Sequence, residues 1–295
     1  MSRLEPIEGR YLRLDVLGTQ YRVYVEQAGA GIPLVCQHTA GADTRQWRHL
    51  MNDPAVTGRF RVIAADLPFH GKSIPPEGVE WWKQEYRLTK EFLLAFHGAL
   101  CRALELDAPA YLGCSVGGHL APDLALERPD LYSAVIGVQS GLGFAPELSA
   151  AMQHHLSYLH HPRIGNDFKG ASMRGLCGPH SPEPSVRETT YVYSSNAPAV
   201  FKGDLHYYFN DHTMTAADAA GIDTQRVAVY FLTGEYDPTT SPAETKALAD
   251  AVAGSHFTPM KGMGHFGMSE DYASFRRYLL PVLEDIAEKR GAPRG

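Results

Sequence analysis

The most informative segment of the chain reads Tyr111-Leu112-Gly113-Cys114-Ser115-Val116-Gly117-Gly118. It places the pattern G-x-S-x-G between an apolar run that predicts a strand and a stretch, residues 116–127, that predicts a helix. A serine at such a turn is held in a strained backbone conformation, and small residues on either side let strand and helix approach closely. The turn is expected to expose the Ser115 hydroxyl at the carboxyl end of a sheet. A tight turn without chemistry is the alternative interpretation of this pattern taken alone.

Two later loops carry the groups that a serine nucleophile needs. A serine hydroxyl requires a base, and the base requires a group that fixes its tautomer. Asp237 lies in a loop after a strongly apolar predicted strand, and His265 lies in a loop after the last predicted strand. The order Ser, Asp, His is the one expected for a G-x-S-x-G serine in a sheet of this kind. We therefore predict Ser115 as nucleophile, His265 as general base and Asp237 as the orienting acid, with Glu235 as the alternative acid.

Strand and helix patterns alternate along most of the chain. Short β-branched or aromatic runs are separated by turn residues and by segments of helical periodicity. This rhythm predicts an α/β fold with a mostly parallel central sheet. Strands are expected at residues 11–16, 21–26, 34–37, 61–65, 110–112, 134–138, 227–233 and 256–259. Helices are expected at residues 44–51, 88–104, 116–127, 241–252 and 269–288.

The alternation stops between residues 141 and 223. Histidine, tyrosine, glycine and proline occur there in irregular order, with no strand pattern. We interpret residues 141–223 as a mainly helical lid, or cap, inserted within a single sheet. Residues 1–140 and 224–295 then form the core.

Beyond the serine motif, two further segments complete a family pattern. Residues 66–73 read Asp-Leu-Pro-Phe-His-Gly-Lys-Ser, and residues 37–41 read Gln-His-Thr-Ala-Gly. On these motifs the chain resembles the α/β-hydrolase superfamily. The resemblance implies a mostly parallel central sheet with helices on both faces, the serine, aspartate and histidine above as a catalytic triad, and an oxyanion loop at residues 37–41.

The oxyanion hole is predicted at Val116, Ala40 and Thr39. The Val116 N–H is expected to point at a developing negative charge because it opens the helix after the serine. By resemblance, the Ala40 N–H is the second donor. Two residues depart from the family pattern: Thr39 stands where glycine is usual, and Pro122 is expected to kink or loosen the helix that follows Ser115.

Several aromatic residues are candidates for the substrate pocket. They would suit an apolar or aromatic acyl group, and the alternative is that they pack the lid. The predicted substrate-binding residues are Trp81, Trp82, Tyr207, Tyr208 and Phe266.

The predicted activity is hydrolysis of a small carboxylic ester or lactone through an acyl-enzyme on Ser115. Two alternatives remain open: hydrolysis of a C–C bond in a diketone-type substrate, and a ligand-binding receptor on the same fold. None of these requires a metal or an organic cofactor. The histidine pairs at 154–155 and 160–161 lack carboxylate or cysteine partners at metal-site spacing. Glu270 and Asp271 are expected to be first-turn carboxylates of the last helix.

Composition narrows the range of partners. The chain has 295 residues, and its formal net charge of −6 is dispersed without a basic cluster, so we do not expect nucleic acid to be a partner. No apolar run approaches the about 20 residues that cross a bilayer. The charged beginning of the chain and four widely spaced cysteines favour a reducing cytoplasm. No pattern fixes the oligomeric state, and a homodimer is one possibility.

Overall fold

Eight strands form one sheet in the order β1-β2-β4-β3-β5-β6-β7-β8. A computed structural model gives the structure of residues 4–291, with the backbone alone for residues 146–149. The strands are β1 (Glu8–Val16), β2 (Thr19–Ala28), β3 (Ile32–Gln37), β4 (Phe60–Ala65), β5 (Ala110–Cys114), β6 (Ala134–Val138), β7 (Ala228–Gly234) and β8 (His256–Met260). From β4 to β8 all neighbours are parallel, while β1 and β2 add an antiparallel hairpin at one edge.

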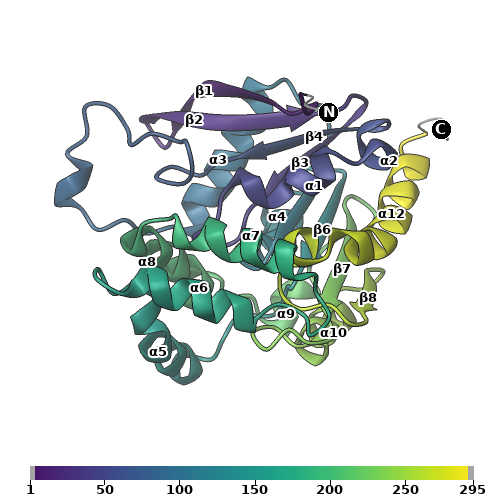
Figure 1. The fold of residues 1–295 in the computed structure, drawn as a ribbon. Helices are drawn as coiled ribbons and strands as arrows, with labels where there is room; N and C mark the ends of the chain where they lie inside the picture. The colour runs from purple at the N-terminus through teal and green to yellow at the C-terminus, as the bar shows by residue number, and fades with distance from the viewer. Residues whose placement is uncertain (1–3, 292–295) are drawn as a thin grey trace.

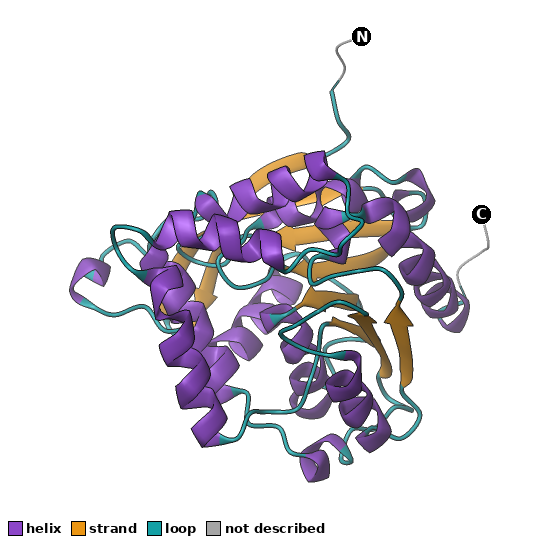
Figure 2. Cartoon of the chain, turned by 60° about the horizontal axis from the view of Figure 1, so that its bottom comes forward, coloured by secondary structure: helices purple, strands orange, loops and turns teal. Residues whose placement is uncertain are grey.

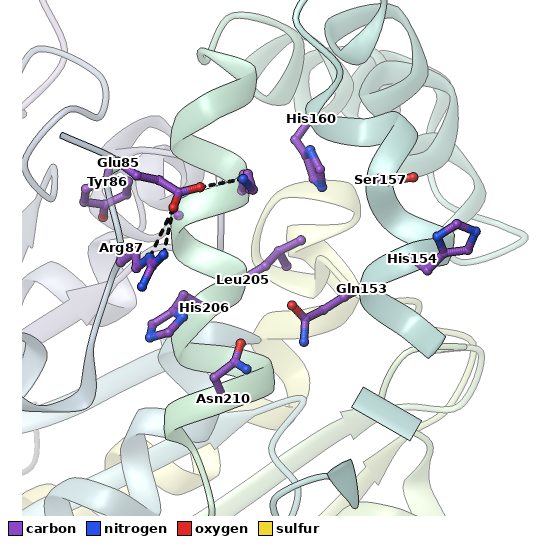
Figure 3. A pocket seen from close by; sticks show the side chains of 12 residues that line it. Glu85, Tyr86, Arg87, Gln153, His154, Ser157, His160, Leu205, His206 and Asn210 are labelled. Carbon is purple, nitrogen blue, oxygen red and sulfur yellow. Dashed lines mark hydrogen bonds and ion pairs between the residues drawn. The ribbon is translucent and has the colours of Figure 1, made fainter. Parts of the chain in front are cut away.

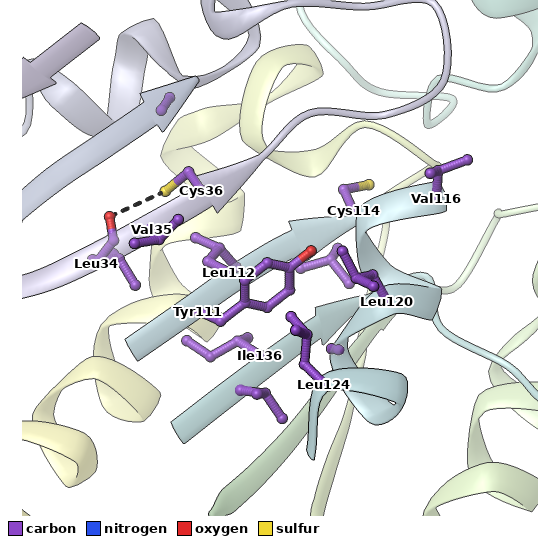
Figure 4. Packing of buried hydrophobic residues seen from close by; sticks show 14 of the residues in the cluster. Leu34, Val35, Cys36, Tyr111, Leu112, Cys114, Val116, Leu120, Leu124 and Ile136 are labelled. Atoms are coloured by element: carbon purple, nitrogen blue, oxygen red, sulfur yellow. Dashed lines mark hydrogen bonds between the residues drawn. The ribbon is translucent and has the colours of Figure 1, made fainter. Parts of the chain in front are cut away.

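Burial explains which strands lie at the centre. Every residue of β5 and β6 is buried, as expected for parallel strands covered on both faces. Figure 4 shows side chains of β3, β5 and β6 packing together with Leu120 and Leu124 of the following helix. Strand β8 pairs only with β7 and contains Pro259, which a strand in the middle of a sheet would not accommodate.

Helices cover both faces of the sheet, which confirms the predicted fold class (Figure 1). On one face, α3 contacts α4, and α9 contacts both α4 and α10. On the other face, α1 contacts α2 and α11, and α11 contacts α12. The first group is α3 (Lys90–Ala103), α4 (Val116–Glu127), α9 (Ala216–Ala219) and α10 (Pro242–Ala251). The second group is α1 (Arg48–Met51), α2 (Pro54–Thr57), α11 (Gly267–Glu270) and α12 (Tyr272–Lys289).

Residues 141–223, called the helical segment below, connect β6 to β7. Figure 2 shows its helices as a layer distinct from the strands, and in Figure 1 α5, α6 and α8 lie together at the lower left, away from β1 and β2. Its elements before α9 are α5 (Pro146–His155), a 3-10 turn η3 (Leu156–His160), α6 (Gly165–Gly175), α7 (Glu183–Ser194), α8 (Pro198–His206) and a π-helical turn η4 (Tyr207–Asp211).

Two expected helices are divided in the structure. The predicted helix at 44–51 is a 3-10 turn, η1 (Thr44–Trp47), followed by α1. The predicted helix at 269–288 is α11 and α12, separated at Asp271, whose backbone is not helical (φ −155°, ψ 76°). Another 3-10 turn, η2 (Trp81–Lys83), lies in the loop after β4. None of the helices within residues 4–291 combines the length and apolar character needed to span a membrane.

Helix α4 is continuous through Pro122. A proline at position 122 removes the N–H that would bond to the Gly118 carbonyl one turn earlier. The hydroxyl of Ser140 donates to that carbonyl instead, at 2.8 Å, and both groups are buried. The freed acceptor therefore keeps a partner, and the helix after Ser115 is not broken.

Candidate active site

Ser115 occupies a strained turn between β5 and α4. Its backbone has φ 58° and ψ −115°, a region that non-glycine residues rarely adopt. A Cβ on Gly113 would lie 2.2 Å from the Gly117 carbonyl oxygen, and one on Gly117 would lie 2.8 Å from that of Gln37. Both glycines are thus required by close packing. The Val116 N–H, at the first position of α4, has no acceptor within its own helix.

His265 and Asp237 form a buried pair. Nδ1 of His265 lies 2.7 Å from Oδ2 of Asp237, and both side chains are nearly inaccessible. The other carboxylate oxygen of Asp237 accepts from the hydroxyl and the backbone N–H of Thr239, each at 2.8 Å. Burial opposes ionisation, but the His265 ring and the Thr239 donors prevail and hold the pKa of Asp237 below its ordinary value. Nδ1 therefore carries a proton toward Asp237, which leaves Nε2 as the acceptor. Glu235 accepts instead from Gly262 N–H at 2.9 Å.

The loop that carries His265 is fixed on several sides. Buried Glu270 accepts from Gly264 N–H at 2.6 Å and Phe266 N–H at 3.3 Å. The N–H of His265 itself donates to the carbonyl of Leu176, in the helical segment, at 2.8 Å. Glu270 stands in the first turn of α11, as expected, and its side chain in addition turns back to hold the preceding loop.

The loop at residues 39–41 has most of its polar groups engaged. The Thr39 N–H donates to Gln46 Oε1 at 3.0 Å, and its hydroxyl bonds to that of Tyr193. The Gly41 N–H donates to Asp204 Oδ2 at 2.7 Å. Within the described part of the chain, the Ala40 N–H has no hydrogen-bond acceptor. Of the three predicted oxyanion-hole residues, Ala40 and Val116 thus keep an available N–H, whereas the Thr39 N–H is already used to anchor the loop.

A cavity of about 110 Å³ brings these groups together. Ser115, His265, Thr239 and the predicted oxyanion residues Thr39, Ala40 and Val116 line it. The rest of its wall is apolar or aromatic and comes largely from the helical segment: Met152, Leu156, Leu159, Met173, Leu176, Tyr193, Phe201, Leu205, Tyr208, Phe209 and Phe266. Ser115 and His265 both line this wall, and within residues 4–291 the Ser115 hydroxyl makes no hydrogen bond. Catalytic hydrogen bonds often tighten only when substrate binds.

Three of the five predicted substrate-binding residues lie elsewhere. Tyr208 and Phe266 line the cavity. Trp81 and Trp82 do not: they stack edge to face on an outer groove and are 40% and 63% exposed. Tyr207 is fully buried, and its hydroxyl donates to Asp123 at 2.7 Å. Trp81, Trp82 and Tyr207 therefore do not line the cavity beside Ser115, because aromatic character alone does not show which side of a helix or loop faces it.

A second, polar pocket of about 570 Å³ adjoins the first (Figure 3). Leu205 of α8 belongs to the walls of both pockets. The polar pocket lies between α5 and α8, where the Gln153 side chain points toward Leu205. The Glu85 carboxylate forms ion pairs with the arginine and the lysine of this pocket, Arg87 at 2.9 Å and Lys202 at 2.5 Å. Leu205 thus separates an apolar inner cavity from a hydrophilic outer one.

The positioning roles of four residues of this site were not predicted. Thr239 and Glu270 hold Asp237 and the His265 loop, while Tyr193 and Asp204 hold the oxyanion loop. The position of Thr239, two residues after Asp237, was an available signal, because a hydroxyl there can cap the carboxylate locally. Tyr193 and Asp204 gave no such signal, because their contacts span more than 150 residues of sequence.

Comparison with known families identifies one matching family. The model described as "alpha/beta hydrolase fold" matches residues 32–272. Among curated proteins, the chain is 29% identical over 163 residues to a pimeloyl-[acyl-carrier protein] methyl ester esterase from Aeromonas hydrophila, covering 52% of this chain and 56% of that protein. It is 27% identical over 147 residues to a 2-hydroxy-6-oxononadienedioate/2-hydroxy-6-oxononatrienedioate hydrolase from Cupriavidus pinatubonensis, covering 48% of each.

The aligned regions are partial. In several curated relatives the match spans between about a third and about a half of the relative's own length. A solved structure, a thermophilic esterase from Thermogutta terrifontis, is similar over 95% of this chain and 98% of that one, with a TM-score of 0.78 and 18% identity. That similarity concerns the fold.

Proposed function

Because the chain belongs to the α/β-hydrolase fold family, we propose that it is a serine hydrolase that cleaves a small, uncharged carboxylic ester or lactone. The observation that carries the proposal is the composition of one cavity wall. This wall includes Ser115, in its strained turn, and the ring of His265, which Asp237 orients. The rest of the wall is mostly apolar or aromatic. These are the parts that acyl transfer through a serine requires.

The proposed reaction has two halves. Nε2 of His265 takes the Ser115 proton as the serine oxygen attacks the substrate carbonyl carbon. The carbonyl oxygen becomes an oxyanion, which the N–H groups of Ala40 and Val116 stabilise. The C–O bond to the leaving group then breaks, and His265 returns the proton to the leaving oxygen. Water, deprotonated by His265, attacks the acyl-enzyme carbonyl; the bond to the Ser115 oxygen breaks, and His265 returns the proton to that oxygen as the carboxylic acid leaves.

The apolar wall supports an uncharged acyl group, aliphatic or aromatic. Its described residues include no lysine and no arginine to pair with a substrate carboxylate. A buried anion without such a partner is costly. The Cupriavidus relative is named for a dianionic substrate, a dienedioate or trienedioate. The wall composition therefore favours an ester or lactone over a C–C bond hydrolase acting on a carboxylate-bearing diketone.

We extend the proposal to the helical segment as a lid over a core of residues 1–140 and 224–295. Support comes from Leu159, Met173 and Phe201, which belong to this segment and line the cavity beside Ser115. The acyl pocket in this proposal is built mainly by the lid. Four unpaired cysteines support a reducing compartment such as the cytoplasm.

The test is release of nitrophenol from p-nitrophenyl butyrate. We expect a pre-steady-state burst with the wild-type protein and a loss of turnover of at least about 10³-fold in Ser115→Ala. Ser133→Ala is the matched control, since the hydroxyl of this serine, just before β6, donates to the Ala108 and Pro109 carbonyls and does not line the cavity. A wild-type protein without turnover on esters and lactones, or a Ser115→Ala variant with full activity, would contradict the proposal.

A further inference from the structure

Asp204 of α8 connects the helical segment to the oxyanion loop. It is 1% exposed, and its carboxylate accepts three hydrogen bonds from the core. Oδ2 accepts from Gly41 N–H at 2.7 Å and from His70 Nε2 at 2.8 Å, while Oδ1 accepts from the Tyr86 hydroxyl at 3.0 Å. Gly41 directly follows Ala40, whose N–H is an oxyanion donor in the proposed mechanism.

His70 pairs with Asp204 as a cation. Its Nε2 faces the Asp204 carboxylate, and its Nδ1 lies 3.0 Å from the Pro68 carbonyl. Because both ring nitrogens face acceptors, both carry protons. Burial opposes that charge, but the Asp204 carboxylate prevails and raises the pKa of His70. A buried ion pair thus joins the helical segment to the turn after β4.

The neighbouring His38 is held neutral and reaches the same loop. Its Nδ1 donates to the Thr39 carbonyl at 2.8 Å, and its Nε2 accepts from Leu67 N–H at 3.1 Å. Burial first, and the charge of His70 second, lower the pKa of His38 to about 4. The two rings lie 4.8 Å apart between centroids. The charge on His70 therefore helps to keep His38 neutral, and the Leu67 N–H on Nε2 fixes the tautomer whose Nδ1 donates to Thr39.

These contacts fix the peptide planes on both sides of the Ala40 Cα. A peptide unit is planar, so holding its oxygen or its N–H orients the whole unit. His38 holds the Thr39 carbonyl, which shares a plane with the Ala40 N–H, and Asp204 holds the Gly41 N–H in the next plane. Phe201, from the same helix as Asp204, packs so tightly on Gly41 that a Cβ there would lie 2.5 Å from its ring. Gly41 also has φ 62°, which favours glycine.

We propose that Asp204 is a positioning residue for the oxyanion hole, so that the Ala40 N–H is correctly aimed only when α8 is docked on the core. This inference rests on the proposed serine hydrolase function. It makes the helical segment part of the catalytic machinery as well as a cover for the acyl chain. A substrate or ligand that displaces α8 would release Gly41 and with it the oxyanion donor.

The molecule contains a matched control for this idea. Asp123 of α4 pairs with His212, whose Nδ1 lies 2.9 Å from the carboxylate and whose Nε2 faces the Gly141 carbonyl at 3.0 Å. Tyr207 donates to the same carboxylate at 2.7 Å. This trio has the composition of Asp204, His70 and Tyr86 and also joins the core to the helical segment. It makes no hydrogen bond to residues 39–41 among those of the described chain.

The experiment compares Asp204→Asn with Asp123→Asn. Removing one oxyanion donor costs about 10²- to 10³-fold in kcat, so a misaimed donor is expected to cost about 10- to 100-fold. For Asp204→Asn we expect that fall in kcat on p-nitrophenyl butyrate, with KM within about threefold. Binding of an alkyl trifluoromethyl ketone, which forms an oxyanion adduct with the serine, should weaken by the factor lost in kcat/KM. Asp123→Asn should lower Tm by a similar amount and keep kcat within about threefold.

A milder pair of variants guards against misfolding. Tyr86→Phe removes one hydrogen bond from Asp204, and Tyr207→Phe removes one from Asp123. We expect a several-fold fall in kcat for the first and none for the second. If the two aspartate variants, or the two tyrosine variants, had equal effects on kcat and on ketone affinity, the inference about Asp204 would be overturned. The proposed hydrolase function would not be affected by that result. A wild-type protein that does not hydrolyse the ester would overturn the proposed function itself.

Discussion

Nδ1 of His265 lies 2.7 Å from Oδ2 of Asp237, and the hydroxyl of Thr239 lies within 2.9 Å of the same ring nitrogen. The ring is therefore held by two neighbours of one loop. Thr239 also donates to the other oxygen of Asp237 at 2.8 Å. This arrangement fixes both the tautomer and the direction of Nε2, which is the atom that must receive the serine proton.

Asp237→Asn should therefore lower kcat by about 10⁴-fold, because an amide favours the wrong tautomer of His265. Thr239→Val should lower kcat by less than about tenfold, since the backbone N–H groups of Thr239 and Thr240 still donate to Asp237. Steady-state kinetics on p-nitrophenyl butyrate, with circular dichroism to establish folding, make the comparison. An Asp237→Asn variant that remains nearly as active as the wild type would show that Asp237 does not orient the base.

Leu205 separates the acyl cavity from the polar outer pocket. Leu205→Ala should join the two and raise kcat/KM for p-nitrophenyl octanoate relative to the butyrate by at least about tenfold, since burial of about two of the four extra methylenes, at about 0.8 kcal/mol each, already gives that factor. Leu104→Ala, which removes a leucine packed on the core away from the cavity, is the control. An unchanged ratio in Leu205→Ala would mean that acyl chains do not extend past this residue.

Ser140 supplies the hydrogen bond that Pro122 denies to the Gly118 carbonyl. Ser140→Ala should destabilise the protein by about 1–3 kcal/mol, because a buried acceptor loses its partner. In a Pro122→Ala background the restored N–H can bond to Gly118, so the same substitution should cost less. Urea unfolding of the four proteins gives the coupling energy. Equal costs in the two backgrounds would contradict this account of the helix.

His97 is a buried neutral histidine whose pKa burial lowers to about 3. An unfolded histidine titrates near 6.5, so between these values the unfolded chain binds a proton that the folded protein does not. This term lowers the free energy of unfolding as pH falls below about 6.5. Relative to His97→Gln, the wild type should lose about 1.4 kcal/mol more per pH unit between pH 5.5 and 4.5. Urea unfolding at several pH values measures the two slopes, and parallel slopes would contradict the prediction.

The sheet could be predicted from sequence because its signal is local. The strands β5 and β6 are short, continuously apolar and followed by turn residues, so their boundaries in the structure agree with the prediction within two residues. The break at Asp271 was not predictable from periodicity, since the apolar positions of α11 and α12 follow one another without a proline or glycine between them.

The site could be predicted only in part, because only some of its residues carry a local sequence signal. Ser115, Asp237 and His265 each lie at the end of a recognisable strand, so topology brings them to one edge of the sheet. Trp81 and Trp82 were assigned from their apolar character, which does not encode direction, and they face solvent and an outer groove. Asp204 was not anticipated because its role depends on where α8 docks, and a helix sequence does not specify its distant neighbours.

The most direct test of the central claim is the site of reaction with a fluorophosphonate, which modifies only an activated serine. The account predicts one adduct per chain by intact-protein mass spectrometry, located on Ser115 by peptide mapping, and lost in both Ser115→Ala and His265→Ala. Labelling at another residue, or an unlabelled Ser115 in a protein that hydrolyses esters, would contradict it.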